Sequence, residues 1–109
     1  MLRHGRGYRV SIELKHAGGA VPSDATDALR EAIAAVCGEA IRDMSVMASS
    51  HDASVVAFNA TVRESNSVKA IAMVDGLLDR CLLATGLFEE FDATGKVIRV
   101  APVERAEGI

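Results

Sequence analysis

Two segments of the chain alternate strictly between apolar and polar residues, and they predict the central strands of a sheet. In residues 8–15 the apolar members are Tyr8, Val10, Ile12 and Leu14. In residues 54–63 they are Val56, Phe58, Ala60 and Val62. Successive side chains of a strand point to opposite faces, so a period of two residues indicates a strand with one buried face. Each of these strands then keeps a second face of polar or small residues.

Two longer segments repeat their apolar residues at helical spacing. The first follows Pro22, with Ser23 or Asp24 as its N-cap, places Arg30 on the solvent side and is expected to end at Gly38. Its apolar stripe is Leu29, Ile33, Val36 and Cys37. The second helix is predicted within residues 65–86, with polar capping residues at its start and Gly86 at its end. Its apolar stripe is wider than one face, which indicates burial on more than one side.

The other strands are less regular. Residues 39–49 carry Met44, Val46 and Ala48 on one parity and Ile41 and Met47 on the other, which predicts a strand with two partly apolar faces or a bulge. A polar turn at 49–52 would join this strand to the next as a hairpin. We expect residues 87–91 to offer a short extra strand, 92–95 a turn, and 96–101 the last strand, which Pro102 ends.

The element order is β-α-β followed by a second β-α-β, and it predicts an α+β fold. Two such units form the ferredoxin-like βαββαβ sandwich, an antiparallel sheet in the strand order 4-1-3-2 with two helices on one face. The extra strand would add a short C-terminal hairpin. We expect one domain at 8–102, a flexible segment at 1–7 and a tail at 103–109. The superfold alone implies no activity, and cysteine runs that ligate iron–sulfur clusters are missing.

Composition narrows the function classes. The 109 residues carry a net charge of −3, which argues against nucleic acid as the main partner. The sequence has no apolar run of about 18 residues, so no membrane partner is expected. Cys37 and Cys81 lie in apolar helical patterns, which favours buried thiols, although a disulfide between them stays open. Frequent Ala and an excess of Arg over Lys are typical of GC-rich bacterial genomes. We therefore expect a reduced, cytoplasmic, bacterial protein without a cofactor.

The sheet face away from the helices is the predicted functional surface. By parity it carries polar and small apolar residues from each strand, while Lys96 is out of parity with Val97. Ligand-binding candidates are Arg9, Asn59, Arg63 and Arg99; interface candidates are Met47, Val55, Ala57 and Val97. The face could be simply solvated, meet a second copy of the chain, or bind an anion through its arginines. Aromatic residues for stacking RNA bases are missing from it.

Catalytic and metal chemistry has weak support. His16 ends the first strand and lies at the same predicted sheet end as His51 and Asp52, a set that would suit a metal or acid–base work if the three converged. The more ordinary interpretation is three surface residues in turns. The Gly18-Gly19 loop lacks the glycine spacing of a phosphate-binding loop. We assign no catalytic and no metal-binding residue.

Three hypotheses follow. The first is a non-catalytic module that self-associates through the open face and acts by binding. The second is a small dimeric enzyme with an anion site on that face. The third is a structural accessory chain of a larger complex, which would leave an exposed apolar patch on the isolated protein.

Overall fold

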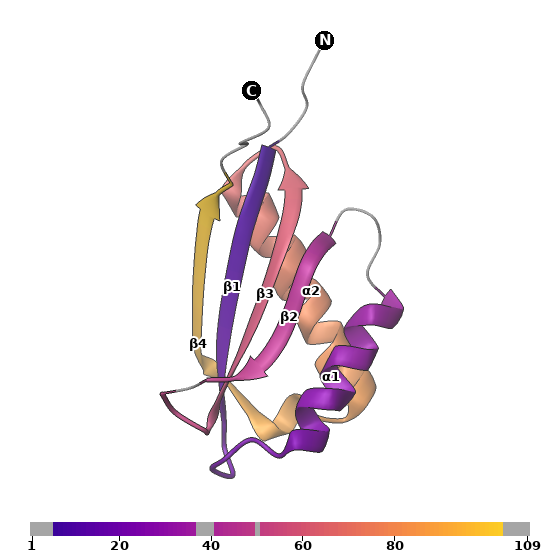
Figure 1. Cartoon of the computed structure of the whole chain (residues 1–109), viewed down its shortest axis with the longest axis vertical. Coiled ribbons are helices and arrows are strands. Elements are labelled where there is room, and N and C mark those ends of the chain that lie inside the picture. Colours follow the sequence, from indigo (N-terminus) through magenta and orange to yellow (C-terminus); the bar gives the residue numbers. More distant parts are fainter. Residues whose placement is uncertain (1–5, 37–40, 50, 104–109) are drawn as a thin grey trace.

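The computed structural model in Figure 1 describes residues 6–36, 41–49 and 51–103. In chain order the elements are β1 (Arg6–His16), α1 (Ser23–Val36), β2 (Ile41–Ala48), β3 (Val55–Glu64), α2 (Ser67–Thr85), the 3₁₀ helix η1 (Phe88–Glu90) and β4 (Phe91–Pro102). The α+β class expected from the sequence is confirmed. The expectations for residues 1–5, Cys37, Gly38 and 104–109 lie outside the described residues.

Four antiparallel strands form one sheet in the order β2-β3-β1-β4. Read from the β4 edge, this is the strand order 4-1-3-2 that the sequence predicts. β1 and β3 are the central pair, and their register runs from Arg6 opposite Glu64 to Lys15 opposite Val55. These are the two segments of strict alternation, because a central strand covered on one face demands a regular period of two.

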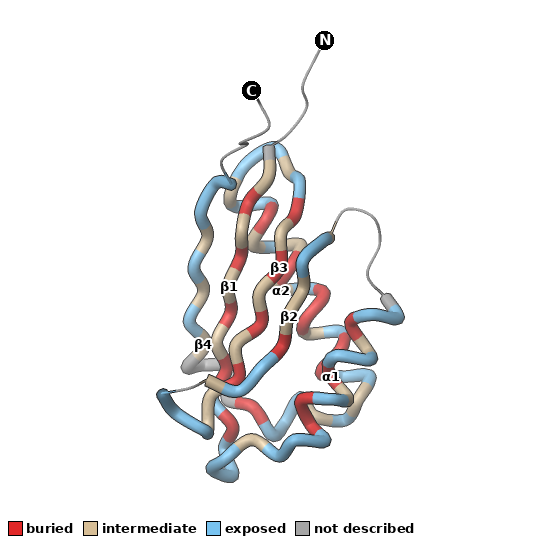
Figure 2. The backbone as a smooth tube through the Cα atoms, in the orientation of Figure 1, coloured by how far each residue is buried: buried red, intermediate tan, exposed pale blue. Residues whose placement is uncertain are grey.

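α2 lies behind the sheet and supplies most of its cover (Figure 1). The inward side chains of β1 and β3 are buried, and Figure 2 shows buried positions recurring along both strands. They pack against the buried residues of α2, which are Ala70, Val74, Leu77, Leu78, Cys81 and Leu82. In the described part of the chain no helix is long and apolar enough to cross a membrane.

Both ends of α2 are capped by side chain or backbone. The Asn66 Oδ1 accepts the Lys69 N–H at 2.9 Å, as an N-cap residue does. Gly86 adopts a left-handed φ of 77°, and the Leu87 N–H donates to the Leu82 carbonyl at 2.9 Å. This is the backbone pattern of a Schellman C-cap, which leaves an apolar residue just after the glycine to pack on the helix.

α1 packs against α2 and β2 and lies beside the β2 edge in Figure 1. Among the described side chains of α1, those of Ala25, Thr26, Leu29 and Ile33 are buried. Arg30 is exposed, as the sequence predicts, but its side chain also reaches β2. Its Nη2 donates to the Val46 carbonyl of β2 at 2.8 Å, so α1 occupies a main-chain acceptor of this edge strand.

A bulge resolves the mixed pattern of β2. The register with β3 shifts between Arg42 and Ser45, and Asp43 takes a positive φ of 52°. The extra residue reverses the side-chain parity, so Ile41 and Met44 both pack against the core. The sequence left open either a strand with two partly apolar faces or a bulge, and the structure confirms the bulge.

The segment before β4 also differs from expectation. Residues 87–91 do not form an extra strand, because Phe88–Glu90 is a 3₁₀ turn and Leu87 belongs to the C-cap of α2. The turn expected at 92–95 is wrong as well, since β4 runs unbroken from Phe91 to Pro102. An irregularity remains there, because the pairing with β1 shifts register between Glu13 and Lys15.

The N-cap of α2 gives a stability test. Replacing Asn66 by Ala removes the acceptor for the Lys69 N–H and should lower the free energy of unfolding by about 1 kcal/mol. Urea denaturation followed by circular dichroism measures the change. Ser65→Ala is the matched control, because the Ser65 side chain makes no hydrogen bond to a described residue, and it should stay within about 0.5 kcal/mol of the parent. Equal losses in the two variants would contradict the capping role.

Candidate functional site on the open sheet face

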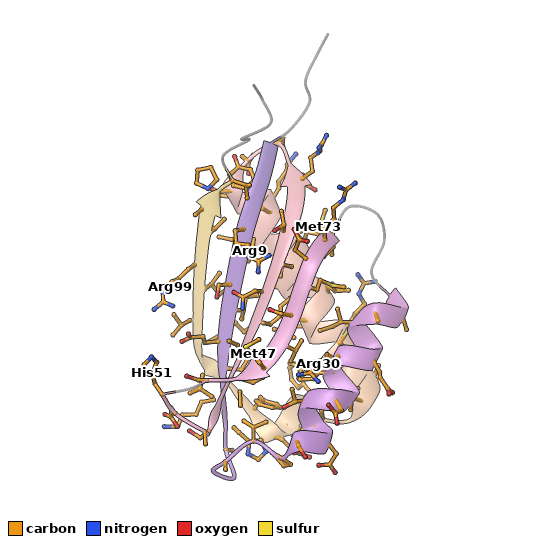
Figure 3. All side chains as sticks on the ribbon, viewed as in Figure 1. Arg9, Arg30, Met47, His51, Met73 and Arg99 are labelled. Atoms are coloured by element: carbon orange, nitrogen blue, oxygen red, sulfur yellow. The ribbon has the colours of Figure 1, made fainter. Side chains whose placement is uncertain are left out.

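The sheet face opposite α2 has no helix packed on it, and we call it the open sheet face. Register and exposure assign its residues, which are Arg9, Ser11, Glu13, Lys15, Arg42, Ser45, Met47, Val55, Ala57, Asn59, Thr61, Arg63, Val97, Arg99 and Ala101. The central positions are half-buried by their neighbours, and the edge positions are exposed. The viewer of Figure 3 looks onto this face.

One row across the face is mostly apolar. Met47, Ala57, Glu13 and Val97 lie opposite one another on the four strands in turn. Met47 is 51% exposed and Val97 is 43% exposed, so the two ends of the row present apolar surface to solvent. Val55 follows Ala57 on the same side of β3 and enlarges the row. All four predicted interface residues therefore lie together, interrupted by the Glu13 carboxylate.

The adjacent row is polar. Ser45, Asn59, Ser11 and Arg99 are aligned across the sheet by the same pairings. The side chains of Ser11 and Asn59 make no hydrogen bond to a described residue. Arg99 Nη1 lies 3.6 Å from the Glu13 Oε2, a loose ion pair at the β4 edge. The row thus offers several hydrogen-bonding groups that the fold itself does not use.

Arg9 is held over the middle of the sheet (Figure 3). Its Nη1 donates to the Asp43 carbonyl and to the Thr61 Oγ1, each at 2.9 Å. The Asp43 carbonyl is reachable because of the bulge in β2, which pushes the backbone of residue 43 out of the regular ladder. Arg9 is therefore fixed in position, whereas the other cations of the face lack comparable anchors.

The open sheet face is basic although the chain is acidic. By register it carries the cations Arg9, Lys15, Arg42, Arg63 and Arg99 against two carboxylate residues, Glu13 and Asp92, while the whole chain has a net charge of −3. The excess of acidic residues consequently lies elsewhere on the molecule. Such a separation of charge favours an anionic ligand or partner on the sheet side.

The structure places all four predicted ligand residues on the open sheet face but spreads them over three strands. Asn59 and Arg99 share a row through Ser11, and Arg9 belongs to the next row. Arg63 is opposite Gly7, one row beyond Arg9, and stays apart from Asn59. The sequence analysis missed Arg42, which lies opposite Thr61 on the open sheet face. Counting alternate residues along β2 from Ser45 places Arg42 on the wrong face, because the bulge lies between these two residues.

The proposed convergence of His16, His51 and Asp52 does not occur. The loop after β1 does meet the hairpin turn, since the Val21 N–H donates to the Ala53 carbonyl at 2.8 Å. His16, however, is buried with Nδ1 3.1 Å from the Gly19 carbonyl and Nε2 3.3 Å from the Glu90 carboxylate. Its ring packs edge-on against Phe91. Among the described residues no group of three His, Cys, Asp or Glu side chains could hold a metal ion.

Asp52 serves the turn instead. Its Oδ1 accepts the Ser54 N–H at 3.0 Å and the Ser54 hydroxyl at 2.6 Å. These hydrogen bonds to the ionised form lower the pKa of Asp52 below its ordinary value of 3.8. The residue therefore stabilises the β2–β3 connection and has no catalytic arrangement.

A shallow pocket of about 310 Å³ lies on the helix side of the molecule. Pro22, Asp24, Ala25, Ala28, Thr85, Leu87 and Glu90 line it. None of the predicted ligand residues belongs to this pocket, so it gives no support to an active site formed by Arg9, Asn59, Arg63 and Arg99.

Lys96 leaves the open sheet face, as its parity indicates. Its Nζ lies 2.6 Å from the Asp75 Oδ1 and 3.6 Å from the Asp79 Oδ1, both on α2. Partial burial lowers the pKa of Lys96, but hydrogen bonds and attraction to the two carboxylates outweigh it and raise the pKa above the ordinary 10.5. The pair therefore ties β4 to the helix layer.

No protein-family model and no curated protein matches this sequence. The geometry of the site is therefore the basis for the functional conclusion.

The raised pKa of Lys96 predicts a pH dependence of stability. A group whose pKa is higher in the folded than in the unfolded state stabilises the fold fully at pH values below its unfolded pKa. This stabilisation is lost as the pH rises through the folded pKa. Lys96→Met should lower the free energy of unfolding by roughly 1 kcal/mol or less near neutral pH. The difference from the parent should narrow above about pH 10.5.

Thermal unfolding of parent and variant at a series of alkaline pH values measures this difference. Lys69→Met is the control. Lys69 is an exposed residue of α2, the helix that carries Asp75 and Asp79, and its side chain makes no contact with either carboxylate. A difference between parent and Lys96→Met that stays constant as the pH rises would contradict the role of the ion pairs.

Proposed function

We propose that this protein is a non-catalytic binding module that associates with a second copy of itself through the open sheet face. The observation that carries the proposal is the row from Met47 to Val97, which crosses the sheet and leaves apolar side chains half exposed at both ends. A second copy related by a two-fold axis would bring the same row against itself, as isologous interfaces do. Burial of these side chains would then drive the association.

The face is a better candidate for this association than the β2 edge. Arg30 already bonds the Val46 carbonyl of β2, and α1 lies along that side of the strand. An edge covered in this way is a poor template for strand addition from another chain. Face-to-face packing of two sheets instead needs interdigitating side chains, which the exposed Met47 and Val97 supply.

The size of the face predicts a weak dimer. Four strands about 4.8 Å apart, each contributing about seven residues at 3.4 Å, give a planar area of roughly 450 Å². Stable interfaces bury about 800 Å² on each partner, and smaller ones are transient. We therefore expect a dissociation constant on the order of micromolar.

Two finer points belong to the same proposal. We propose that the fold is the ferredoxin-like arrangement, which the order β-α-β-β-α-β and the sheet order β2-β3-β1-β4 support. We also propose a cytoplasmic setting, consistent with Cys81 as a buried thiol-bearing side chain in α2.

A small dimeric enzyme is the less favoured function. General acid–base work needs a carboxylate or imidazole within hydrogen-bonding reach of a substrate. On the paired rows of the open sheet face Glu13 already faces Arg99, and Asp92 is paired with Lys15. His16 is buried against Phe91 and Glu90, away from this face. The described residues therefore supply contacts for binding and no acid–base set.

Substitution of Met47 tests the self-association. Sedimentation velocity of the parent should show a reversible dimer at about 50 µM, the range expected for a small interface. Met47→Arg should make the protein monomeric, because it adds a cation to each of two facing surfaces that are already basic. Its thermal stability should change little, since the side chain is 51% exposed.

Val68→Arg is the matched control. Val68 is 73% exposed on α2, away from the open sheet face, and the same substitution there should leave the dimer intact. A parent that stays strictly monomeric, or a dimer that Val68→Arg disrupts and Met47→Arg does not, would rule out the proposed interface.

A further inference from the structure

Arg9 is a fixed guanidinium with unused donors. Both bonds to the protein, to the Asp43 carbonyl and the Thr61 hydroxyl, come from Nη1. An arginine side chain has five N–H groups, so those on Nε and Nη2 stay available. They have no hydrogen-bond partner among the described residues. A guanidinium that is already immobilised loses little entropy when it binds an oxyanion.

The neighbouring polar row supplies further donors. Ser11 follows Arg9 on the same side of β1 and is paired with Asn59 on one flank and Arg99 on the other. The hydroxyl and amide groups of Ser11 and Asn59 are uncommitted, and the Arg99 contact with Glu13 is long, at 3.6 Å. Paired strands lie about 4.8 Å apart, so Ser11 and its partner Asn59 are near enough to contact one phosphate or carboxylate group. Arg99 is two strands away from Asn59 and points outward from the β4 edge in Figure 3, so it lies outside this group.

Pairing of two open sheet faces creates an electrostatic problem that an anion would solve. Each copy brings the five cations named above against Glu13 and Asp92, so the two-copy interface would hold an uncompensated positive charge. Charges closer than about 10 Å repel each other strongly at ordinary ionic strength. The small area of the face leaves little hydrophobic driving force to offset this repulsion.

We propose that the open sheet face binds a small polyvalent oxyanion at Arg9, Ser11 and Asn59, and that the anion promotes pairing of two copies by neutralising the cations that pairing brings together. The ligand class is a phosphate or a di- or tricarboxylate, since arginine and amide donors recognise both. The effect on pairing rests on the proposed self-association; the binding site itself does not.

Two measurements on the full chain separate binding from pairing. The first is a titration of dilute ¹⁵N-labelled protein with sodium phosphate at constant ionic strength, followed by amide chemical shifts. The shifts should concentrate at Arg9, Ser11 and Asn59. The second is sedimentation velocity in sodium chloride, phosphate and citrate at matched ionic strength. At saturating anion the dimer should tighten about tenfold for each bound anion that the dimer holds about ten times more strongly than the monomer does.

The extent to which phosphate and citrate each tighten the dimer distinguishes a phosphoryl ligand from a carboxylate ligand. Arg9→Gln should abolish the response of the dimer to phosphate and, by removing a repelling cation, should tighten the dimer in chloride alone. Arg80→Gln removes the same charge from an exposed position on α2. It should change neither the response of the dimer to phosphate nor the affinity of the dimer in chloride. Asn59→Asp, which places a carboxylate in the site, should likewise remove the phosphate shifts.

The outcomes are distinct. Absence of localised phosphate shifts overturns the anion site, and a dimer equally tight in chloride and phosphate overturns the effect of the anion on pairing while self-association stands. Localised shifts without a dimer in any buffer overturn self-association and leave the anion site in place.

Discussion

The fold depends on the apolar layer between the central strands and α2. Every second residue of β1 and β3 enters this layer, and α2 covers it with a stripe too wide for a single contact. Removing this surface from water is the main source of stability for a domain of this size. The side chains that point into this layer are every second residue of each strand. The residues between them do not pack in the core, so they can be the charged and polar residues of the open sheet face.

Strict periodicity made part of this arrangement predictable. The alternation in β1 and β3 fixes which residues share a face, and it led directly to Arg9, Asn59 and Val97 as neighbours on one side of the sheet. The capping residues of α2 carried a similarly local signal, since Asn66 and Gly86 each satisfy backbone groups within a few residues. Local rules of this kind require no knowledge of the rest of the fold.

The errors arose where tertiary structure changes a local pattern. The bulge at Asp43 reverses the parity of β2, so that Ile41 turns inward and Arg42 outward. Leu87 has the apolar character of a strand residue, but it follows the C-cap of α2. The favoured interpretation of His16 as a surface residue in a turn is wrong, because the residue is buried. The ring is instead drawn inward to Phe91 and Glu90, which the 3₁₀ turn places there.

The contact between Arg30 and the Val46 carbonyl has a consequence for misfolding. In the native state α1 shields the β2 side of the sheet, so this edge is protected only while α1 stays docked. Transient detachment of that helix would expose an unsatisfied strand edge next to the apolar residues Ile41 and Met44. Such a partly unfolded species would be the aggregation-prone form of the molecule, because exposed strand edges recruit other chains. α1 packs mainly on α2 and on one edge of the sheet, and it is thus also the helix that keeps this edge from pairing with other chains.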